Sequence, residues 1–151
     1  MAKDEVYMQR ALALAERAKD SDEVPIGAII VYKAKIIAQA HNQVECLKDP
    51  TAHAEMIAIT QAASFLKSKW LKGCRLYVTV EPCLMCAGAL VLSRIDQVIF
   101  GVADPKTGAF GSKIDLNRLR LNHKLKIKRK ILEKDCAKIL QTFFKEKRNK
   151  G

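Results

Sequence analysis

The sequence lacks any apolar run long enough to cross a membrane. Its longest apolar runs, of which Ile26–Tyr32 is one, fall far short of the roughly 18 residues that a membrane helix needs. The opening residues, Met1–Glu5, lack the apolar core of a secretory signal. We therefore expect a cytoplasmic protein, with no membrane partner and with reduced thiols.

Proline and glycine are also sparse, with four and seven residues, and no repeat or flexible linker interrupts the chain. Hydrophobic residues make up 49% and charged residues 28%, which excludes a disordered or low-complexity chain. A length of 151 residues is typical of one domain that buries its own core. We expect a single domain over residues 1–151.

The cysteines do not fit a disulfide framework, because their number, five, is odd. Cys46, Cys74 and Cys136 stand alone, and we interpret them as small buried apolar residues. Cys83 and Cys86 differ from these, since they form a Cys-x-x-Cys pair.

Acidic residues are scarce in the C-terminal part of the chain. Residues 113–151 contain 14 Lys or Arg but only four Asp or Glu, and so hold +10 of the total formal charge of +11. Such an uneven excess is typical of polyanion binding, most simply of nucleic acid. A solvated basic face that favours solubility explains the charge equally well.

Hydrophobic periodicity predicts helices that alternate with strands, as in a layered α/β domain. Helices are expected over residues 4–19, 52–66, 83–92 and 133–147, and strands over residues 24–32, 35–41, 75–80, 97–101 and 124–131. Residues 104–108 have the composition of a loop. The final helix and tail, about residues 133–151, form a basic C-terminal segment.

Two predicted helix starts carry residues suited to metal binding. Cys83 and Cys86 are three positions apart, so their sulfur atoms share one face of a helix. His53 adds a nitrogen from a second helix. One His and two thiolates make three zinc ligands and leave the fourth tetrahedral position open, which is typical of a catalytic site. We expect one Zn²⁺ per chain.

Glu55, two residues after His53, is the candidate catalytic carboxyl group. Burial should raise its pKa and a nearby zinc charge should lower it, and the sequence leaves the net effect open. A carboxyl group that takes a proton from water and returns it to a leaving group is what hydrolytic deamination requires. His-x-Glu, followed about 28 residues later by Pro-Cys-x-x-Cys, is the signature of zinc deaminases.

Beyond this signature, nearly the whole chain resembles the bacterial tRNA-specific adenosine deaminases. The segments that carry the resemblance are Glu23–Ala28, Ala40–Asn42, Asp49–Glu55, Leu76–Ala89, Ser93–Ile95, Asp104–Gly108, Asn122–His123 and Phe143–Phe144. The resemblance implies a three-layer α-β-α, cytidine deaminase-like fold with a central five-stranded mixed sheet. It also implies a homodimer that hydrolyses the wobble adenosine of a tRNA anticodon loop to inosine, classically in an arginine tRNA.

The resemblance further implies which residues touch the RNA. Asn42 is expected to contact the flipped-out nucleoside, and the backbone near Ala54 and Cys83 to line the reacting centre. The residues expected to hold neighbouring nucleotides are Asp104, Lys106, Asn122, Phe144 and Arg148.

Several of these residues also have a purely structural interpretation. Asn42 ends a strand and Asp104 precedes Pro105, and both positions favour a turn former. Phe143 continues an apolar helical stripe and is expected in the core. For Phe144 the pattern leaves core packing and RNA contact equally open.

Two other functions remain open from the sequence. A deaminase of free guanine or cytosine compounds could use the same scaffold, but it would need no basic surface. A zinc-stabilised RNA-binding module without catalysis is the second, and it would have no use for Glu55 beside an open metal position.

Overall fold

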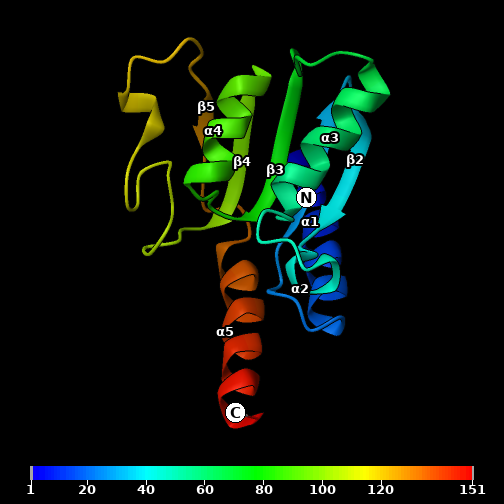
Figure 1. The fold of residues 1–151 in the computed structure, drawn as a ribbon, viewed down its shortest axis with the longest axis vertical. Coiled ribbons are helices and arrows are strands. Elements are labelled where there is room, and N and C mark those ends of the chain that lie inside the picture. Colours follow the sequence, from blue (N-terminus) through cyan, green and yellow to red (C-terminus); the bar gives the residue numbers. More distant parts are fainter. Residues whose placement is uncertain (1, 151) are drawn as a thin grey trace.

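The computed structural model describes residues 2–150, so Met1 and Gly151, the end points of the predicted domain, lie outside the described residues. Five strands form one mixed sheet in the order β2-β1-β3-β4-β5 (Figure 1). They are β1 (Gly27–Tyr32), β2 (Lys35–His41), β3 (Cys74–Val80), β4 (Gln97–Val102) and β5 (Lys126–Lys128). β1 is antiparallel to β2 and β3, whereas β3, β4 and β5 are mutually parallel. The predicted five-stranded mixed sheet is confirmed.

Helices cover both faces of this sheet, which gives the three predicted layers. The helices are α1 (Lys3–Asp20), α2 (Val44–Leu47), α3 (Ala54–Leu66), α4 (Leu84–Ser93) and α5 (Glu133–Lys150), with a 3-10 turn η1 (Leu116–Arg118). Buried residues of α3 and α4 share one core with the sheet, and those of α1 and the start of α5 share a second core on its other face. In Figure 1, α5 runs on past the lower edge of the sheet.

The central strands are apolar on both faces because each face is covered by helices. Ile30 and Val98 belong to the core under α3 and α4, while the neighbouring Ile29 and Ile99 belong to the core under α1 and α5. Successive side chains of a strand point to opposite faces, so adjacent residues enter different cores. The continuous apolar runs of the sequence follow from this two-sided burial.

α1 packs against the start of β1 at a position where only glycine fits. A Cβ atom on Gly27 would lie 2.0 Å from the carbonyl oxygen of Ala11 and 2.6 Å from the backbone nitrogen of Ala15. The alanines of α1 permit this close approach, since they carry the smallest apolar side chain. The contact sets how closely α1 packs on the start of β1.

β1 is shorter than the strand predicted over residues 24–32. Pro25 has no N–H group for a strand ladder. The N–H of Ile26 bonds locally, to the carbonyl oxygen of Val24 at 2.8 Å. The chain therefore joins the sheet only at Gly27.

β5 is also shorter than predicted, at three residues instead of residues 124–131. The backbone of Leu125 bonds to the side chain of Asn117 at 2.9 and 3.1 Å, and not to a neighbouring strand. At the other end, Lys130 and Leu132 adopt positive φ angles of 66° and 52°, which end the extended conformation. α2 and η1 were not predicted, because elements of three or four residues are too short to show periodicity.

Residues 2–150 contain no helix that is both long and apolar enough to cross a membrane. Cys74 and Cys136 are buried, as predicted, but Cys46 is exposed, so its interpretation as a core residue is wrong. Cys46 lies in α2, none of whose residues is buried.

Candidate functional site

α3 and α4 begin at the same end of the sheet, the end at which its parallel strands finish. α4 follows β3 directly, and α3 precedes β3 and runs back along it, so both helix starts lie at the end of β3 (Figure 1). His53 is the N-cap of α3 and Cys83 the N-cap of α4, each with extended backbone angles. Helix N-termini carry unpaired N–H groups and a partial positive charge, which favours thiolates there.

The structure brings the three predicted zinc ligands together. The Nδ1 atom of His53 lies 3.4 Å from the Sγ atom of Cys86 and 3.6 Å from that of Cys83. All three ligand atoms lie within 4.8 Å of one another. Tetrahedral zinc, with Zn–N near 2.1 Å and Zn–S near 2.3 Å, needs nitrogen and sulfur about 3.5 Å apart. The donor set and its spacing therefore fit a zinc ion.

Hydrogen bonds within this cluster separate the proton affinities of its members. A bond from Cys86, reinforced by one from His53, lowers the pKa of the Cys83 thiol to about 4 against the opposing effect of burial. The pKa of the Cys86 thiol is raised by its hydrogen bond to Cys83 and by burial. The pKa of His53 is raised by a separate hydrogen bond, from its own ring to Cys83. A metal ion would replace the shared protons, so its affinity should rise with pH.

Glu55 is buried next to this cluster, with only 3% of its surface exposed. Among the side chains of residues 2–149, its Oε1 atom is the one buried oxygen or nitrogen without a hydrogen-bond partner. Burial raises the pKa of Glu55 to about 7, and the charge of Cys83 adds to the shift. An unpaired buried carboxyl group destabilises a fold, so its position here indicates a chemical role.

A cavity of 730 Å³ reaches the cluster at His53. Asn42, His53 and Phe144 contribute to its walls, together with Asp22, Glu23, Val24, Ile26, Val44, Glu45, Pro50, Phe143 and Lys147. The side-chain oxygen of Asn42 accepts a hydrogen bond of 2.8 Å from the N–H of Ala54, the first residue of α3. This bond leaves the two amide N–H donors of Asn42 for a ligand.

A second cavity, of 340 Å³, has Asp104, Lys106 and Phe144 among its walls, so Phe144 is shared by both cavities. Phe144 is 45% exposed, whereas Phe143 is buried, as expected. The carboxylate of Asp104 accepts bonds from the N–H groups of Lys106 and Thr107 at 3.0 and 3.2 Å. Asp104 therefore shapes its own turn, which agrees with its structural interpretation.

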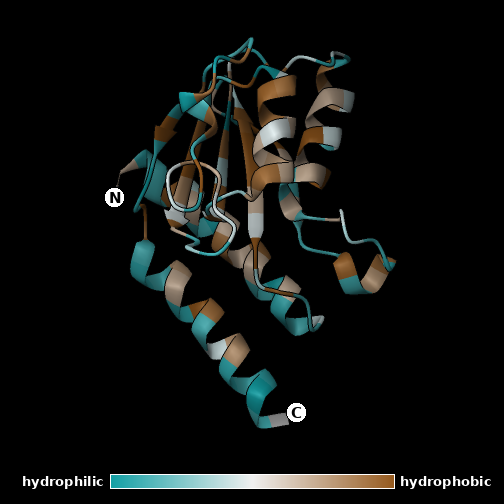
Figure 2. Cartoon of the chain, turned by 60° about the vertical axis from the view of Figure 1, so that its left-hand side comes forward, coloured by the Kyte–Doolittle hydropathy of each residue, from teal (hydrophilic) through white to brown (hydrophobic). Residues whose placement is uncertain are grey.

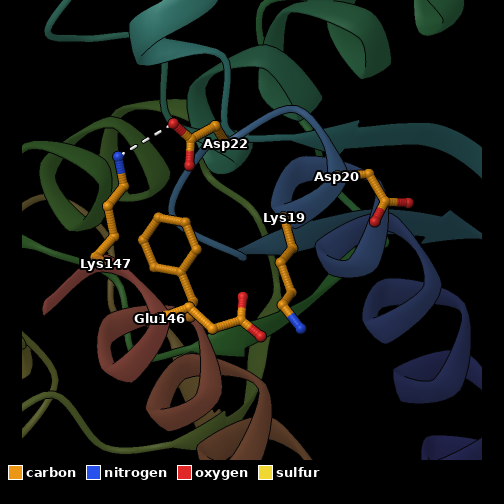
Figure 3. Close-up of a pocket in the computed structure, with 6 residues that line it drawn as sticks. Lys19, Asp20, Asp22, Glu146 and Lys147 are labelled. Carbon is orange, nitrogen blue, oxygen red and sulfur yellow. Dashed lines mark hydrogen bonds and ion pairs between the residues drawn. The ribbon is translucent and has the colours of Figure 1, made fainter. Parts of the chain in front are cut away.

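α5 is tied to the turn after α1 beside these cavities. Lys147 bonds to Asp22 at 3.1 Å, and this pair lines a smaller cavity of 250 Å³ together with Lys19 and Phe143 (Figure 3). Figure 2 shows α5 leaving the body of the molecule, with hydrophilic residues at its free end. Arg148 is exposed in this last part of the helix.

Asn122 and Arg148 line neither of the two cavities, and Asn122 lies well away from the cluster. Its carbonyl oxygen lies 3.5 Å from Nη1 of Arg94, and it lines a cavity with Arg94 and Trp70. Arg94 is the C-cap of α4, while Cys83 is its N-cap. The ten residues between them span about 15 Å at 1.5 Å per residue. Asn122 therefore lies at the far end of α4 from the metal-ligand cluster.

Two residues near the site were missed by the sequence analysis. Lys147 lines the large cavity, and nothing distinguishes it from the other lysines of the tail. Glu81 precedes the Pro-Cys-x-x-Cys motif and is buried, with 3% of its surface exposed. Its hydrogen-bond partners lie 23 to 31 positions further along the chain, so no local pattern could indicate them.

Comparisons with known proteins agree with this geometry. Residues 2–148 match the MafB19-like deaminase family. The chain is 51% identical to a tRNA-specific adenosine deaminase of Aquifex aeolicus over 96% of each chain. It is 46% identical to one of Bacillus subtilis, over 99% of this chain and 94% of the relative. A solved chain from work on A-to-I editing by tRNA:A34 deaminases at the wobble position of transfer RNA superposes with a TM-score of 0.87, at 39% identity. That match covers 89% of this chain and 99% of the other.

The pKa of Glu55 predicts a pH-dependent stability for the metal-free protein. Because the folded pKa of about 7 exceeds the ordinary value of 4.5, the fold is destabilised as pH rises from 4.5 through 7. Glu55→Gln should therefore be more stable than the wild type by about 3 kcal/mol at pH 8 and by much less at pH 5. Urea unfolding with a chelator and a reductant measures this, with the exposed Glu16→Gln of α1 as the control. An equal difference at both pH values would contradict it.

Proposed function

The chain belongs to the tRNA-specific adenosine deaminases, and we propose that it hydrolyses adenosine to inosine at the wobble position of a tRNA anticodon loop. We further propose an arginine tRNA as substrate, a cytoplasmic location and one deaminase domain over residues 1–151. The observation that carries the chemistry is the unpaired Glu55 carboxyl group beside the cluster of His53, Cys83 and Cys86.

His53, Cys83 and Cys86 are the proposed ligands of one Zn²⁺. Zinc held by three protein ligands supplies a Lewis acid that makes water acidic enough to react at neutral pH. The overall reaction consumes adenosine and water and yields inosine and ammonia.

Glu55 is the proposed proton carrier of this reaction. Its unpaired Oε1 atom can accept a proton from the attacking water, and the neutral carboxyl group can return that proton to the departing amino group. Burial favours the neutral form that this second step requires. The oxygen of water bonds to C6 of the base before the bond from C6 to the amino nitrogen breaks. One proton of the water leaves with the amino group as ammonia, and the other ends on N1 of the inosine.

The large cavity is the proposed site of the flipped-out nucleoside. Asn42 would donate from its amide to the base, and Ala54 would line the site through its backbone. Phe144, between the two cavities, offers an exposed ring on which a neighbouring base can stack. The remaining residues proposed to hold flanking nucleotides are Asp104, Lys106, Asn122 and Arg148.

The two alternative functions are less well supported. A deaminase of free bases or nucleosides has no use for the exposed Phe144 and the basic free end of α5 beside its cavity. A non-catalytic RNA-binding module gains nothing from a buried carboxyl group that lacks a partner.

We also propose that the protein is a homodimer. Leu84 and Leu92 are 60% and 79% exposed, and they lie with Gly88 at four-residue intervals on one face of α4. Asn122 lies at the far end of α4 from its own Cys83, so it would reach RNA bound at the site of a second copy.

The dimer predicts that a charge on this face separates the copies. Leu92→Asp should shift the purified protein from dimer to monomer, because an unpaired carboxylate would be buried at the contact. Sedimentation equilibrium measures the mass, with Leu47→Asp as the control, since Leu47 is 55% exposed on α2. A wild-type protein that sediments as a monomer would rule out the homodimer.

The activity itself is tested with a synthetic arginine anticodon stem-loop that carries adenosine at the wobble position. The zinc-loaded protein should form inosine there and should leave free adenosine, cytidine and guanine unchanged. Glu55→Gln should lose at least about 10²-fold in kcat, because general acid–base catalysis contributes that much, and should keep its zinc. Ammonia release from a free base alone would overturn the tRNA assignment, and an active Glu55→Gln would overturn the mechanism.

The neighbouring phenylalanines of α5 provide a matched pair for the RNA contact. Phe144→Ala should raise KM for the stem-loop about tenfold, because loss of one base stack costs about 1–3 kcal/mol, and should leave the fold stable. Phe143→Ala should lower the free energy of unfolding by about 3–5 kcal/mol, because Phe143 is buried. Steady-state kinetics and urea unfolding of both variants check this. A Phe144→Ala variant with unchanged KM would remove Phe144 from the contact.

A further inference from the structure

Glu81 accepts four hydrogen bonds from one loop. Its Oε1 atom accepts from the N–H of Asp104 at 3.1 Å and from the hydroxyl of Ser112. Its Oε2 atom accepts from the N–H groups of Phe110 and Ser112 at 2.9 and 3.2 Å. A carboxylate has about four acceptor positions, so all of them are used within the chain.

The loop, residues 103–112, is shaped to fit around this carboxylate. A Cβ atom on Gly108 would lie 2.3 Å from Cδ of Glu81, so the backbone of Gly108 rests directly on the carboxylate. Arg129 holds the loop from the other side, because its Nη2 atom donates to the carbonyl oxygen of Phe110 at 2.8 Å. Phe110 thus bonds to a negative group through its N–H and to a positive group through its carbonyl oxygen.

The same loop is paired with the backbone of the metal-ligand motif. The N–H of Ala109 donates to the carbonyl oxygen of Pro82 at 2.9 Å, and Cys83 and Gly108 form an antiparallel β-bridge. The position of Cys83 at the start of α4 therefore depends on the loop that Glu81 holds. The other end of the loop carries Asp104 and Lys106, which line the second cavity.

We propose that Glu81 is a positioning residue that fixes Cys83 for metal binding and the Asp104–Thr107 turn for RNA through one loop. Glu81 itself touches neither the metal nor the substrate. The inference rests on the proposed function to the extent that Cys83 is taken as a zinc ligand and the turn as an RNA contact.

Glu81→Gln tests the proposal, because the amide has nearly the same shape but turns an NH₂ group toward two of the four donors. Transfer of zinc from the loaded protein to the chromophoric chelator 4-(2-pyridylazo)resorcinol should become at least about 10-fold faster, because loss of a residue that orients a metal ligand lowers metal affinity by about 10- to 100-fold. Amide hydrogen exchange of residues 103–112 should also accelerate. With the stem-loop, KM should rise and kcat should fall.

Two further variants separate positioning from general stability. Asp4→Asn removes another largely buried carboxylate, which accepts from Tyr77 at 2.6 Å and pairs with Lys128, at a distance in sequence from the loop. It should lower the melting temperature but leave zinc transfer and loop exchange as in the wild type. Ser112→Ala removes one donor to Glu81 and should accelerate zinc transfer and loop exchange to a smaller extent. If Glu81→Gln does not fold, the result for Ser112→Ala tests the proposal in its place.

The proposal would be overturned if zinc transfer and loop exchange in Glu81→Gln were as slow as in the wild type. The same outcome in Ser112→Ala would overturn it if Glu81→Gln does not fold. Acceleration by Asp4→Asn equal to that by Glu81→Gln would also overturn it, because the effect would then reflect stability alone. A wild-type protein that binds zinc but forms no inosine would refute the proposed function, and zinc transfer would still test Glu81. If the wild type bound no zinc, the metal part of both proposals would be wrong.

Discussion

The candidate site depends on one geometric constraint: two helices begin at the same end of the sheet, where the parallel strands finish. The parallel pairing of β3 and β4 requires α4 to cross back over the sheet, so α4 starts where β3 ends. α3 runs antiparallel to β3, so it also starts at the end of the sheet where β3 finishes. His53 and Cys83 are the N-caps of these helices, so packing of the two helices on one core brings the ligand atoms together. The apolar core under α3 and α4 therefore sets the geometry of the polar cluster.

The candidate reaction site and the proposed RNA-binding surface lie on different parts of the molecule. Glu55, the cysteines and the histidine are held by the sheet and by α3 and α4, where side chains have little freedom. Phe144 and the basic residues come from α5, which extends away from the body of the molecule past the lower end of the sheet in Figures 1 and 2. The rigid part fixes distances of a few ångströms, and the projecting helix offers a wide basic surface.

The sequence predicts much of this architecture and all three residues of the cluster. Periodicity locates the long helices and central strands, because their burial repeats regularly. The spacing of His53, Cys83 and Cys86 predicts a group of side chains that could hold a metal ion, and the structure brings them together. The features that the sequence does not predict depend on single contacts between residues far apart in the chain. The shortened β5 follows from the side chain of Asn117, and the loop at residues 103–112 follows from Glu81. The location of Asn122 depends on the three-dimensional path of the chain after η1, which no local pattern records.

The edges of the sheet limit how copies of this chain can associate. β5 is only three residues long and exposes Lys126 and Lys128, and the other edge strand, β2, begins with the exposed Lys35. The shortness of β5 and the charged lysine side chains on both edge strands disfavour edge-to-edge pairing, which otherwise extends without limit. The exposed apolar face of α4 is a single patch, so two copies that join through it use up the patch on both. The homodimer proposed above would therefore be a closed pair and not an open fibre.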